Sequence, residues 1–149
     1  MAVSCSHNAW SGSNGTFMRW RRLLAQAAGL PPLDLMEGFY VPLASKHSYD
    51  FPTLFIDDAA RAQEHLGWLD QMLPLRWETL KPDPLLVLLS HSDCDGEIAP
   101  ELCERLANRL DQLIPMLPTG KDGQWVEVTQ VFADGLRRAA SANQPLRFY

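Results

Sequence analysis

Apolar residues recur at the spacing of an amphipathic helix in several stretches of the chain. The clearest stretch is residues 100–113, where Pro100 suits the first turn and Pro115 follows the end. Its apolar stripe consists of Leu102, Leu106, Leu110 and Leu113, widened by Cys103, Ala107 and Ile114. The same spacing predicts helices over residues 16–28, with Thr16 as N-cap, from 57 or 58 to 73, and over 130–142.

The best strand candidate in the chain is residues 85–90, a continuous apolar stretch that ends at Ser90. Pro84 precedes it and a turn-like polar loop follows, and its lack of alternation indicates burial on both faces in a central position. Shorter strands are expected at residues 76–80 and 146–149. Residues 125–129 fit either a strand or the first turns of the last helix.

The remaining segments carry weaker patterns. Residues 1–15 are polar and glycine-rich, as in a loop, and residues 30–56 are irregular, broken by Pro42 and Pro52. Gly135 interrupts a helical pattern, which suggests the close approach of another backbone. The sequence therefore predicts one α+β domain over residues 1–149, with three to four helices packed on a small mixed sheet.

Composition and charge narrow the function classes. The net charge of −5 argues against general nucleic-acid binding, which requires a basic surface. No apolar run approaches the roughly 20 residues of a membrane helix. The odd number of cysteines (Cys5, Cys94 and Cys103) and the absence of a signal sequence predict reduced thiols and a cytoplasmic location.

The candidate chemistry lies in a polar loop after the predicted central strand. The side chains of His91, Asp93, Asp95 and Glu97 lie close together in sequence, and Gly96 allows the loop to curl. Carboxylates two residues apart before a glycine are typical of calcium loops, although His91 and Glu101 depart from that pattern. A zinc site is an alternative, with the ligand set Cys5, His7, His91 and Cys94.

Two further interpretations of this loop remain open. In a catalytic one, His91 acts as general acid or base with Asp93 or Glu97, or activates Cys94 as a nucleophile. In a structural one, the aspartates and serines accept backbone N–H bonds in a turn and complement the dipole of the following helix.

The N-terminal segment supplies other candidates. Its serines and glycines precede a helix that carries Arg19, Arg21 and Arg22, an arrangement that suits a phosphate or a carboxylate, although such arginines are commonly only solvated on the outer face of a helix. Trp10 is a candidate for a ligand or partner surface because no helical stripe explains it. We expect His7, Asn8 and Trp10 to share a surface patch with residues 91–97.

Three blocks, residues 5–12 with 17–21, 89–97 and 132–139, resemble a family of small uncharacterised proteins of bacteriophage and bacterial genomes with a His-Ser-Asp-Cys-Asp-Gly-Glu loop. The resemblance implies a small accessory protein of the kind that phages encode, and such proteins often inhibit a host factor or sequester a signalling molecule. It assigns no catalytic role.

These observations predict a non-enzymatic binding protein that uses a polar patch around residues 91–97 to hold a protein or small ligand. A divalent cation, calcium or zinc, is its expected cofactor, with His91, Asp93, Asp95 and Glu97 as ligands. The alternative is a small metal-dependent hydrolase that uses His91, Asp93 and Asp95.

Overall fold

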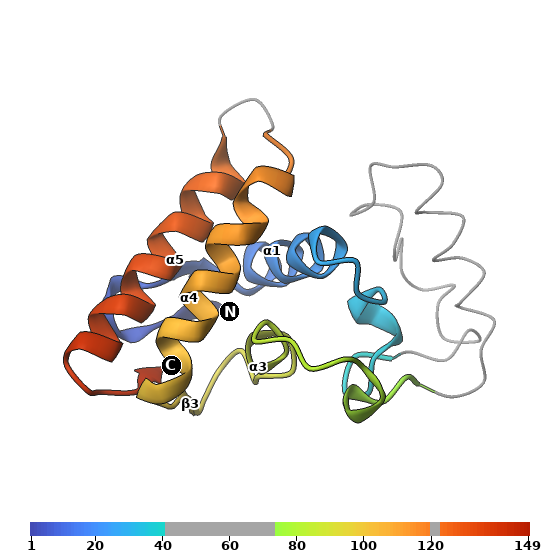
Figure 1. The fold of residues 1–149 in the computed structure, drawn as a ribbon, viewed down its shortest axis with the longest axis horizontal. Helices are drawn as coiled ribbons and strands as arrows, with labels where there is room; N and C mark the ends of the chain where they lie inside the picture. The colour runs from blue at the N-terminus through green and yellow to red at the C-terminus, as the bar shows by residue number, and fades with distance from the viewer. Residues whose placement is uncertain (41–73, 120–122) are drawn as a thin grey trace.

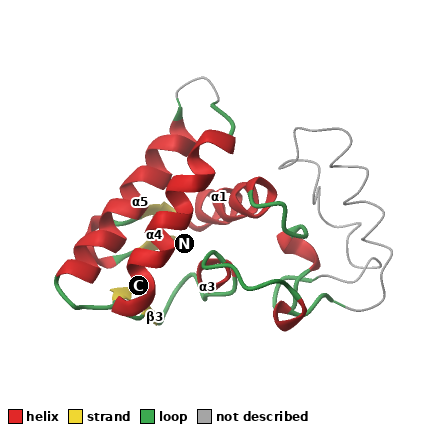
Figure 2. Ribbon diagram, in the orientation of Figure 1, coloured by secondary structure: helices red, strands yellow, loops and turns green. Residues whose placement is uncertain are grey.

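The computed structural model describes residues 1–40, 74–119 and 123–149. These residues form an α+β fold, as the sequence predicts, in which helices predominate (Figures 1 and 2). The helices are α1 (Asn14–Ala27), α3 (Leu86–Leu89), α4 (Pro100–Leu113) and α5 (Gln124–Ser141). The strands are β1 (Ala2–Ser4), β2 (Ser11–Ser13), β3 (Glu97–Ile98) and β4 (Leu146–Arg147). The helix expected to end at residue 73 and most of the irregular stretch 30–56 lie outside the described residues.

Helices α4 and α5 lie side by side, and α1 runs across their direction and extends to the right of α4 in the view of Figure 1. The prediction for α4 is confirmed, with Pro100 in its first turn and most of its stripe fully buried. Leu102 departs from the prediction, because 36% of its surface remains exposed. Helix α5 begins at Gln124, so the ambiguous residues 125–129 are its first turns.

Helix α1 supplies the aromatic centre of the core. The hydroxyl oxygen of Ser13 accepts a hydrogen bond from the backbone N–H of Thr16 at 3.1 Å, so Ser13 is the N-cap and the prediction of Thr16 was wrong. Trp20 is fully buried and its indole N–H donates to the Thr129 hydroxyl at 2.8 Å. This bond ties α1 to α5 within the core.

The prediction of a central strand over residues 85–90 was wrong. Residues Leu86–Leu89 form the short helix α3, with Leu85, Leu88 and Leu89 buried. The Asp83 carboxylate accepts the Leu85 N–H at 2.8 Å, which turns the chain at the Asp-Pro pair and starts the helix. The expected edge strand over residues 76–80 is instead the 3₁₀ turn Trp77–Thr79.

The strands form two antiparallel pairs that meet at the end of the chain. Strands β1 and β2 make a hairpin, so residues 1–15 are more ordered than the predicted loop. Strand β3 pairs with β4, and a bridge between Cys5 and Phe148 connects the two ladders. Residues 146–149, called here the C-terminal segment, therefore run between the N-terminal hairpin and the end of the 91–97 loop.

Candidate functional site

Two of the sequence-predicted segments flank the C-terminal segment. On one edge, Ser4 and Tyr149 exchange backbone hydrogen bonds of 3.4 and 2.9 Å. On the other edge, Glu97 pairs with Arg147, and the Phe148 N–H donates to the Gly96 carbonyl at 3.0 Å. The tertiary structure thus brings the N-terminal turn and the 91–97 loop to neighbouring positions on one surface.

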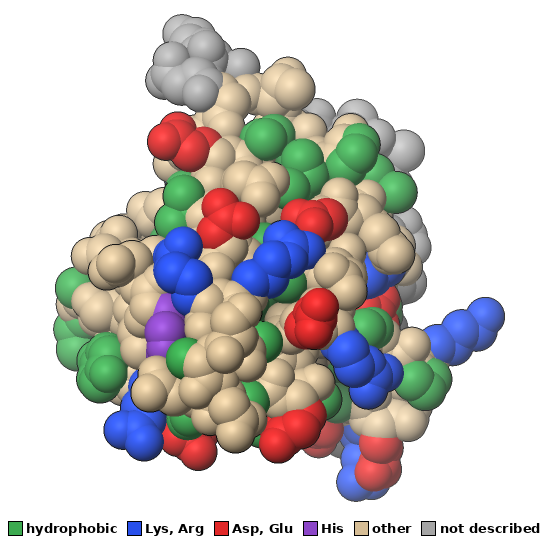
Figure 3. Space-filling view, turned by 60° about the vertical axis from the view of Figure 1, so that its left-hand side comes forward, with side chains coloured by type: hydrophobic (Ala, Val, Ile, Leu, Met, Phe, Trp, Pro, Cys, Tyr) green, Lys and Arg blue, Asp and Glu red, His purple; other side chains and the backbone are tan. Residues whose placement is uncertain are grey.

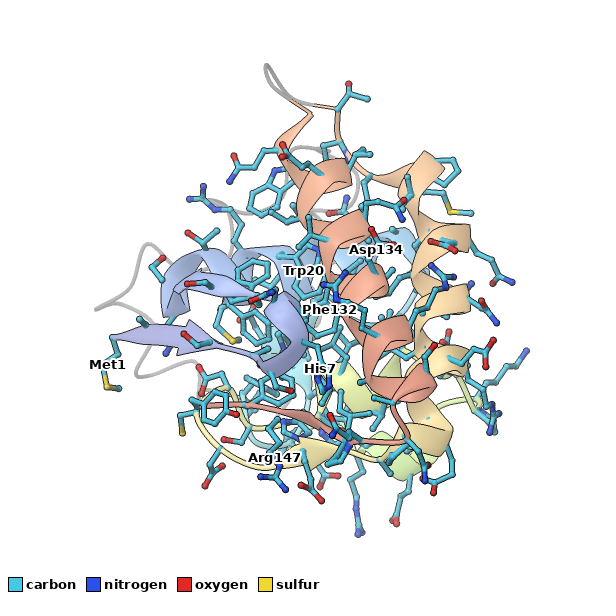
Figure 4. The ribbon with its side chains drawn as sticks, turned by 90° about the vertical axis from the view of Figure 1, so that its left-hand side faces the viewer. Met1, His7, Trp20, Phe132, Asp134 and Arg147 are labelled. Atoms are coloured by element: carbon cyan, nitrogen blue, oxygen red, sulfur yellow. The ribbon has the colours of Figure 1, made fainter. Side chains whose placement is uncertain are left out.

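A cavity of about 270 Å³ opens between the N-terminal turn and the C-terminal segment. We call it the His7 cavity; its lining consists of Ser6, His7, Gln144, Pro145, Arg147 and Tyr149. Figure 4 shows His7 and Arg147 on the same side of the molecule, where the C-terminal segment runs beneath the hairpin. A small polar group fits a cavity of this size and composition.

The backbone beside this cavity adopts a rare conformation at two consecutive residues. His7 and Asn8 have φ angles of 56° and 53°, in the left-handed region that side chains disfavour. Arg138 of α5 holds the turn by donating from Nε and Nη2 to the His7 carbonyl at 3.0 and 2.6 Å. Such locally unfavourable backbone persists only where surrounding contacts enforce it, and it is concentrated at functional sites.

The imidazole of His7 is fixed by hydrogen bonds on both nitrogens. Its Nε2 lies 3.0 Å from the Gln144 amide oxygen, which only accepts, so Nε2 donates. Its Nδ1 lies 3.0 Å from the Ser6 hydroxyl, which also accepts the backbone N–H of Arg147 at 2.9 Å. The ring, the serine and the C-terminal segment therefore form one connected network at the cavity wall.

Two arginines lie at or beside the His7 cavity, although the protein is acidic overall. Arg147 lies at its rim, where its Nε is 3.4 Å from a Glu97 oxygen, and both side chains are more than half exposed. Arg138 lies beside the turn through its bonds to the His7 carbonyl. Figure 3 shows one face of the molecule, on which basic side chains lie above and below a histidine and acidic side chains lie among them.

The 91–97 loop folds around the ring of His91. This ring stacks on Phe148 with centroids 4.3 Å apart, and its Nδ1 and Nε2 lie 2.6 and 3.2 Å from the carbonyl oxygens of Ser92 and Glu97. Gly96 has a φ of 92°, and a Cβ there would lie 3.1 Å from the His91 ring. The loop therefore requires glycine at position 96 for both backbone geometry and space.

The other predicted ligands of this loop face different neighbours. Glu97 pairs with Arg147, Cys94 and Asp95 are exposed, and Asp93 exerts its charge on the buried Arg21. Among the residues that the structure describes, no three His, Cys, Asp or Glu side chains are grouped so as to hold a metal ion. Metal binding by His91, Asp93, Asp95 and Glu97 stays a prediction.

The metal prediction has a direct test. Protein purified without an affinity tag should carry about one equivalent of calcium or zinc by elemental mass spectrometry, and Asp95→Asn should lose it because one anionic ligand is removed. Asp134→Asn is a suitable control because Asp134 is an exposed aspartate on α5. Equal metal content in the two variants, or none in the unmodified protein, would contradict the hypothesis.

The expectation that the arginines of α1 lie on its solvated face was wrong for Arg21, which is buried and positions the 91–97 loop. Arg21 of α1 is 1% exposed, and its Nη2 donates to the carbonyl oxygens of Leu89 and His91, the latter at 2.7 Å. Burial lowers its pKa to about 10, while the nearby charge of Asp93 acts in the opposite direction. The Asp93 carboxylate therefore lies near enough to Arg21 to favour the charged form of this buried side chain.

The remaining predicted site residues lie elsewhere. Trp10 is buried with its ring stacked on Trp20, at a centroid distance of 5.1 Å, and Arg22 pairs with Asp34 at 2.9 Å. Arg19 is exposed on α1. Burial raises the pKa of the Cys5 thiol to about 12, which disfavours the thiolate that a zinc site requires.

Four polar residues of the His7 cavity were missed by sequence analysis: Ser6, Gln144, Arg147 and Tyr149. No motif marks them, because they are dispersed between the two ends of the chain. One signal pointed in the right direction. Gly135 does face another backbone, that of Ala9, directly after the left-handed turn.

Comparison with models of protein families, with curated proteins and with solved structures found no match. In the described parts of the chain, no helix is both long and apolar enough to cross a membrane. The functional inference therefore depends on the geometry of the described residues.

Proposed function

We propose that this chain is a non-enzymatic binding protein, an accessory protein that captures an anionic group of a host protein or small molecule. The binding surface consists of the His7 cavity and the adjoining 91–97 loop. The anion is a carboxylate or a phosphate, which the basic side chains around the cavity attract.

The observation that carries this proposal is the enforced left-handed turn at His7 and Asn8. It places the His7 ring at the cavity wall. Arg138 fixes the turn by donating to the His7 carbonyl, and the Gln144 amide oxygen accepts a hydrogen bond from the ring. A preorganised polar wall favours binding because little ordering entropy remains to be lost when a ligand arrives.

The electrostatic part of the proposal depends on Arg147. Its ion pair with Glu97 is long and exposed, so it is worth little and exchanges readily for a ligand anion. The Tyr149 side chain adds a hydroxyl donor beside it. A bound oxyanion would then receive a charged contact and neutral hydrogen bonds from a single wall.

Inorganic phosphate and succinate are suitable first probes. With a Kd near 1 mM, 20 mM phosphate would stabilise the folded protein by about 1.8 kcal/mol and raise Tm by roughly 5 °C. We expect Arg147→Gln to lose most of this increase, because the charged contact is removed. Differential scanning fluorimetry at constant ionic strength measures both effects.

Arg76→Gln is the matched control. Arg76 and Glu78 form an exposed ion pair of 3.0 Å that resembles the Arg147–Glu97 pair but lies away from the cavity. The control should retain the full increase in Tm. Equal responses of the two variants to phosphate and succinate, or no response of the unmodified protein to either, would contradict the proposal.

A further inference from the structure

A second cavity lies between the outer edge of β2 and the first half of α5. Its volume is about 210 Å³, and its principal lining residues are Trp10, Ser11, Gly12, Glu127, Val128 and Val131. We call it the Trp10 pocket. It shares no lining residue with the His7 cavity.

The indole N–H of Trp10 has no acceptor in the described parts of the chain. Only 6% of the surface of Trp10 is exposed, and its Nε1 atom is buried. Leaving a buried donor unpaired costs about 1–3 kcal/mol, so such groups are uncommon in folded proteins. Trp10 and Gly12 both line the pocket, and a Cβ at position 12 would lie 3.4 Å from Nε1. The donor therefore lies next to Gly12, which forms part of the pocket wall and has no side chain to cover it.

The backbone of Ser11 also points toward the pocket. At the two ends of the β1–β2 hairpin, the Cys5 N–H donates to the Trp10 carbonyl and the Asn14 N–H donates to the Met1 carbonyl. In an antiparallel pair, hydrogen-bonded and non-hydrogen-bonded residue pairs alternate, so the pair Ser4↔Ser11 is a non-hydrogen-bonded one. Ser4 accordingly directs its own N–H and C=O to Tyr149 on the opposite side. By the same alternation, the N–H and C=O of Ser11 point away from β1. They point outward from the edge of β2 that pairs with no other strand in the described residues.

The opposite wall comes from α5 and has a different character. Val128 and Val131 provide apolar surface, and Val131 is 43% exposed. Glu127 adds an exposed carboxylate. A complementary occupant has a hydrogen-bond acceptor for the Trp10 indole and an alternating donor and acceptor for the Ser11 backbone. It also has an apolar side chain to pack on the valines and a positive charge near the Glu127 carboxylate.

We propose that the Trp10 pocket binds an extended, basic peptide segment that adds as a third strand to the edge of β2. The peptide backbone pairs with Ser11, one of its carbonyls accepts the Trp10 indole N–H, and a β-branched side chain packs on the two valines. A lysine or arginine of the peptide lies near Glu127. Strand addition of this kind combines backbone pairing for affinity with side-chain pockets for specificity. This site is independent of the proposed anion site.

The probe is a pentapeptide of sequence lysine-valine-threonine-valine-lysine, acetylated and amidated at its ends. Titration into ¹⁵N-labelled protein should shift the indole peak of Trp10, which Trp10→Phe identifies, and the amide peak of Ser11. N-acetylvaline methylamide carries the same amide and apolar groups but cannot pair as a strand. It should bind at least tenfold more weakly.

Gly12→Ala is the decisive variant, and Gly15→Ala is its matched control. The methyl group at position 12 would cover the indole N–H at an ordinary contact distance, so the fold tolerates it while peptide affinity falls at least tenfold. A Cβ at Gly15 meets nothing within 4 Å, so its variant should bind as the unmodified protein does. Glu127→Gln is exposed and should lower affinity several-fold.

Three results would overturn the proposal. These are an unmoved Trp10 indole peak at saturating peptide, equal affinity of the Gly12→Ala and Gly15→Ala variants, and equal binding of the single-residue amide and the peptide. If Gly12→Ala does not fold, unchanged affinity in Glu127→Gln overturns the basic-peptide assignment. Arg147→Gln should bind the peptide normally, which separates this test from that of the anion site.

Discussion

Replacing Gly135 by alanine is expected to lower the free energy of unfolding by about 3 kcal/mol. The added Cβ would lie 2.4 Å from the Cβ and 2.6 Å from the Cα of Ala9. Neither atom belongs to a flexible side chain, so the turn at His7 and Asn8 or the axis of α5 must move. The higher helix propensity of alanine returns only about 1 kcal/mol.

Urea denaturation followed by circular dichroism measures this loss. Gly15→Ala in α1 is the control, and we expect it to be neutral or stabilising by up to about 1 kcal/mol, because its Cβ meets open space within the helix. The Gly135→Ala variant should also lose its response to phosphate. A variant with unchanged stability would contradict the contact between Ala9 and α5.

Replacing Arg21 by methionine is expected to cost about 2–3 kcal/mol of stability. Methionine retains the apolar stem between Phe17 and Phe39, whose ring centroids lie 5.3 and 5.2 Å from the guanidinium carbon. It leaves the carbonyl oxygens of Leu89 and His91 without their donor. Burying the arginine charge itself costs stability, so its removal offsets part of this loss. The expected net cost is therefore smaller than the cost of leaving two buried carbonyl oxygens unpaired.

Two measurements separate this effect from a general loss of charge. Arg105→Met, at an exposed position of α4, should change stability by less than about 0.5 kcal/mol. In Arg21→Met, hydrogen exchange should accelerate first at residues 90–97, because the arginine fixes that loop. Uniform acceleration over the whole molecule, or equal stability of the two variants, would contradict a positioning role for Arg21.

Local sequence was sufficient for the long helices. Pro100 and the buried stripe of α4 define that element without help from the rest of the chain. Phe132, Leu136 and Ala139 do the same for α5. In both, one apolar face repeats over at least three turns, so the helical period exceeds any competing pattern.

Residues 85–90 show where the pattern failed. A short apolar run has no periodicity by which a buried strand differs from a buried helix. Leucine favours a helix, and the Asp83-Pro84 pair is a helix-start signal that outweighs Val87. The four-residue helix α3 follows from that turn and from the burial of Leu85, Leu88 and Leu89.

Some residues of the candidate sites could be identified from the sequence and others could not. His7 and the 91–97 loop were identified from residue type alone, because histidines and carboxylates in a glycine-containing loop are chemically conspicuous. Gln144, Arg147 and Tyr149 were missed because nothing distinguishes them until the C-terminal segment is inserted beside Cys5. Asp93 was interpreted as a ligand, whereas the structure also places its carboxylate near the buried Arg21.

By itself, the sequence determined the α+β class, the helices α4 and α5 and the segments rich in polar chemistry, because each of these depends on residues close together in the chain. Only the tertiary structure decided which polar groups meet. The His7 cavity joins the two ends of the chain, the Trp10 pocket joins β2 to α5, and Arg21 reaches across to the 91–97 loop. Contacts between distant segments depend on the packing of the whole core, which local patterns do not encode.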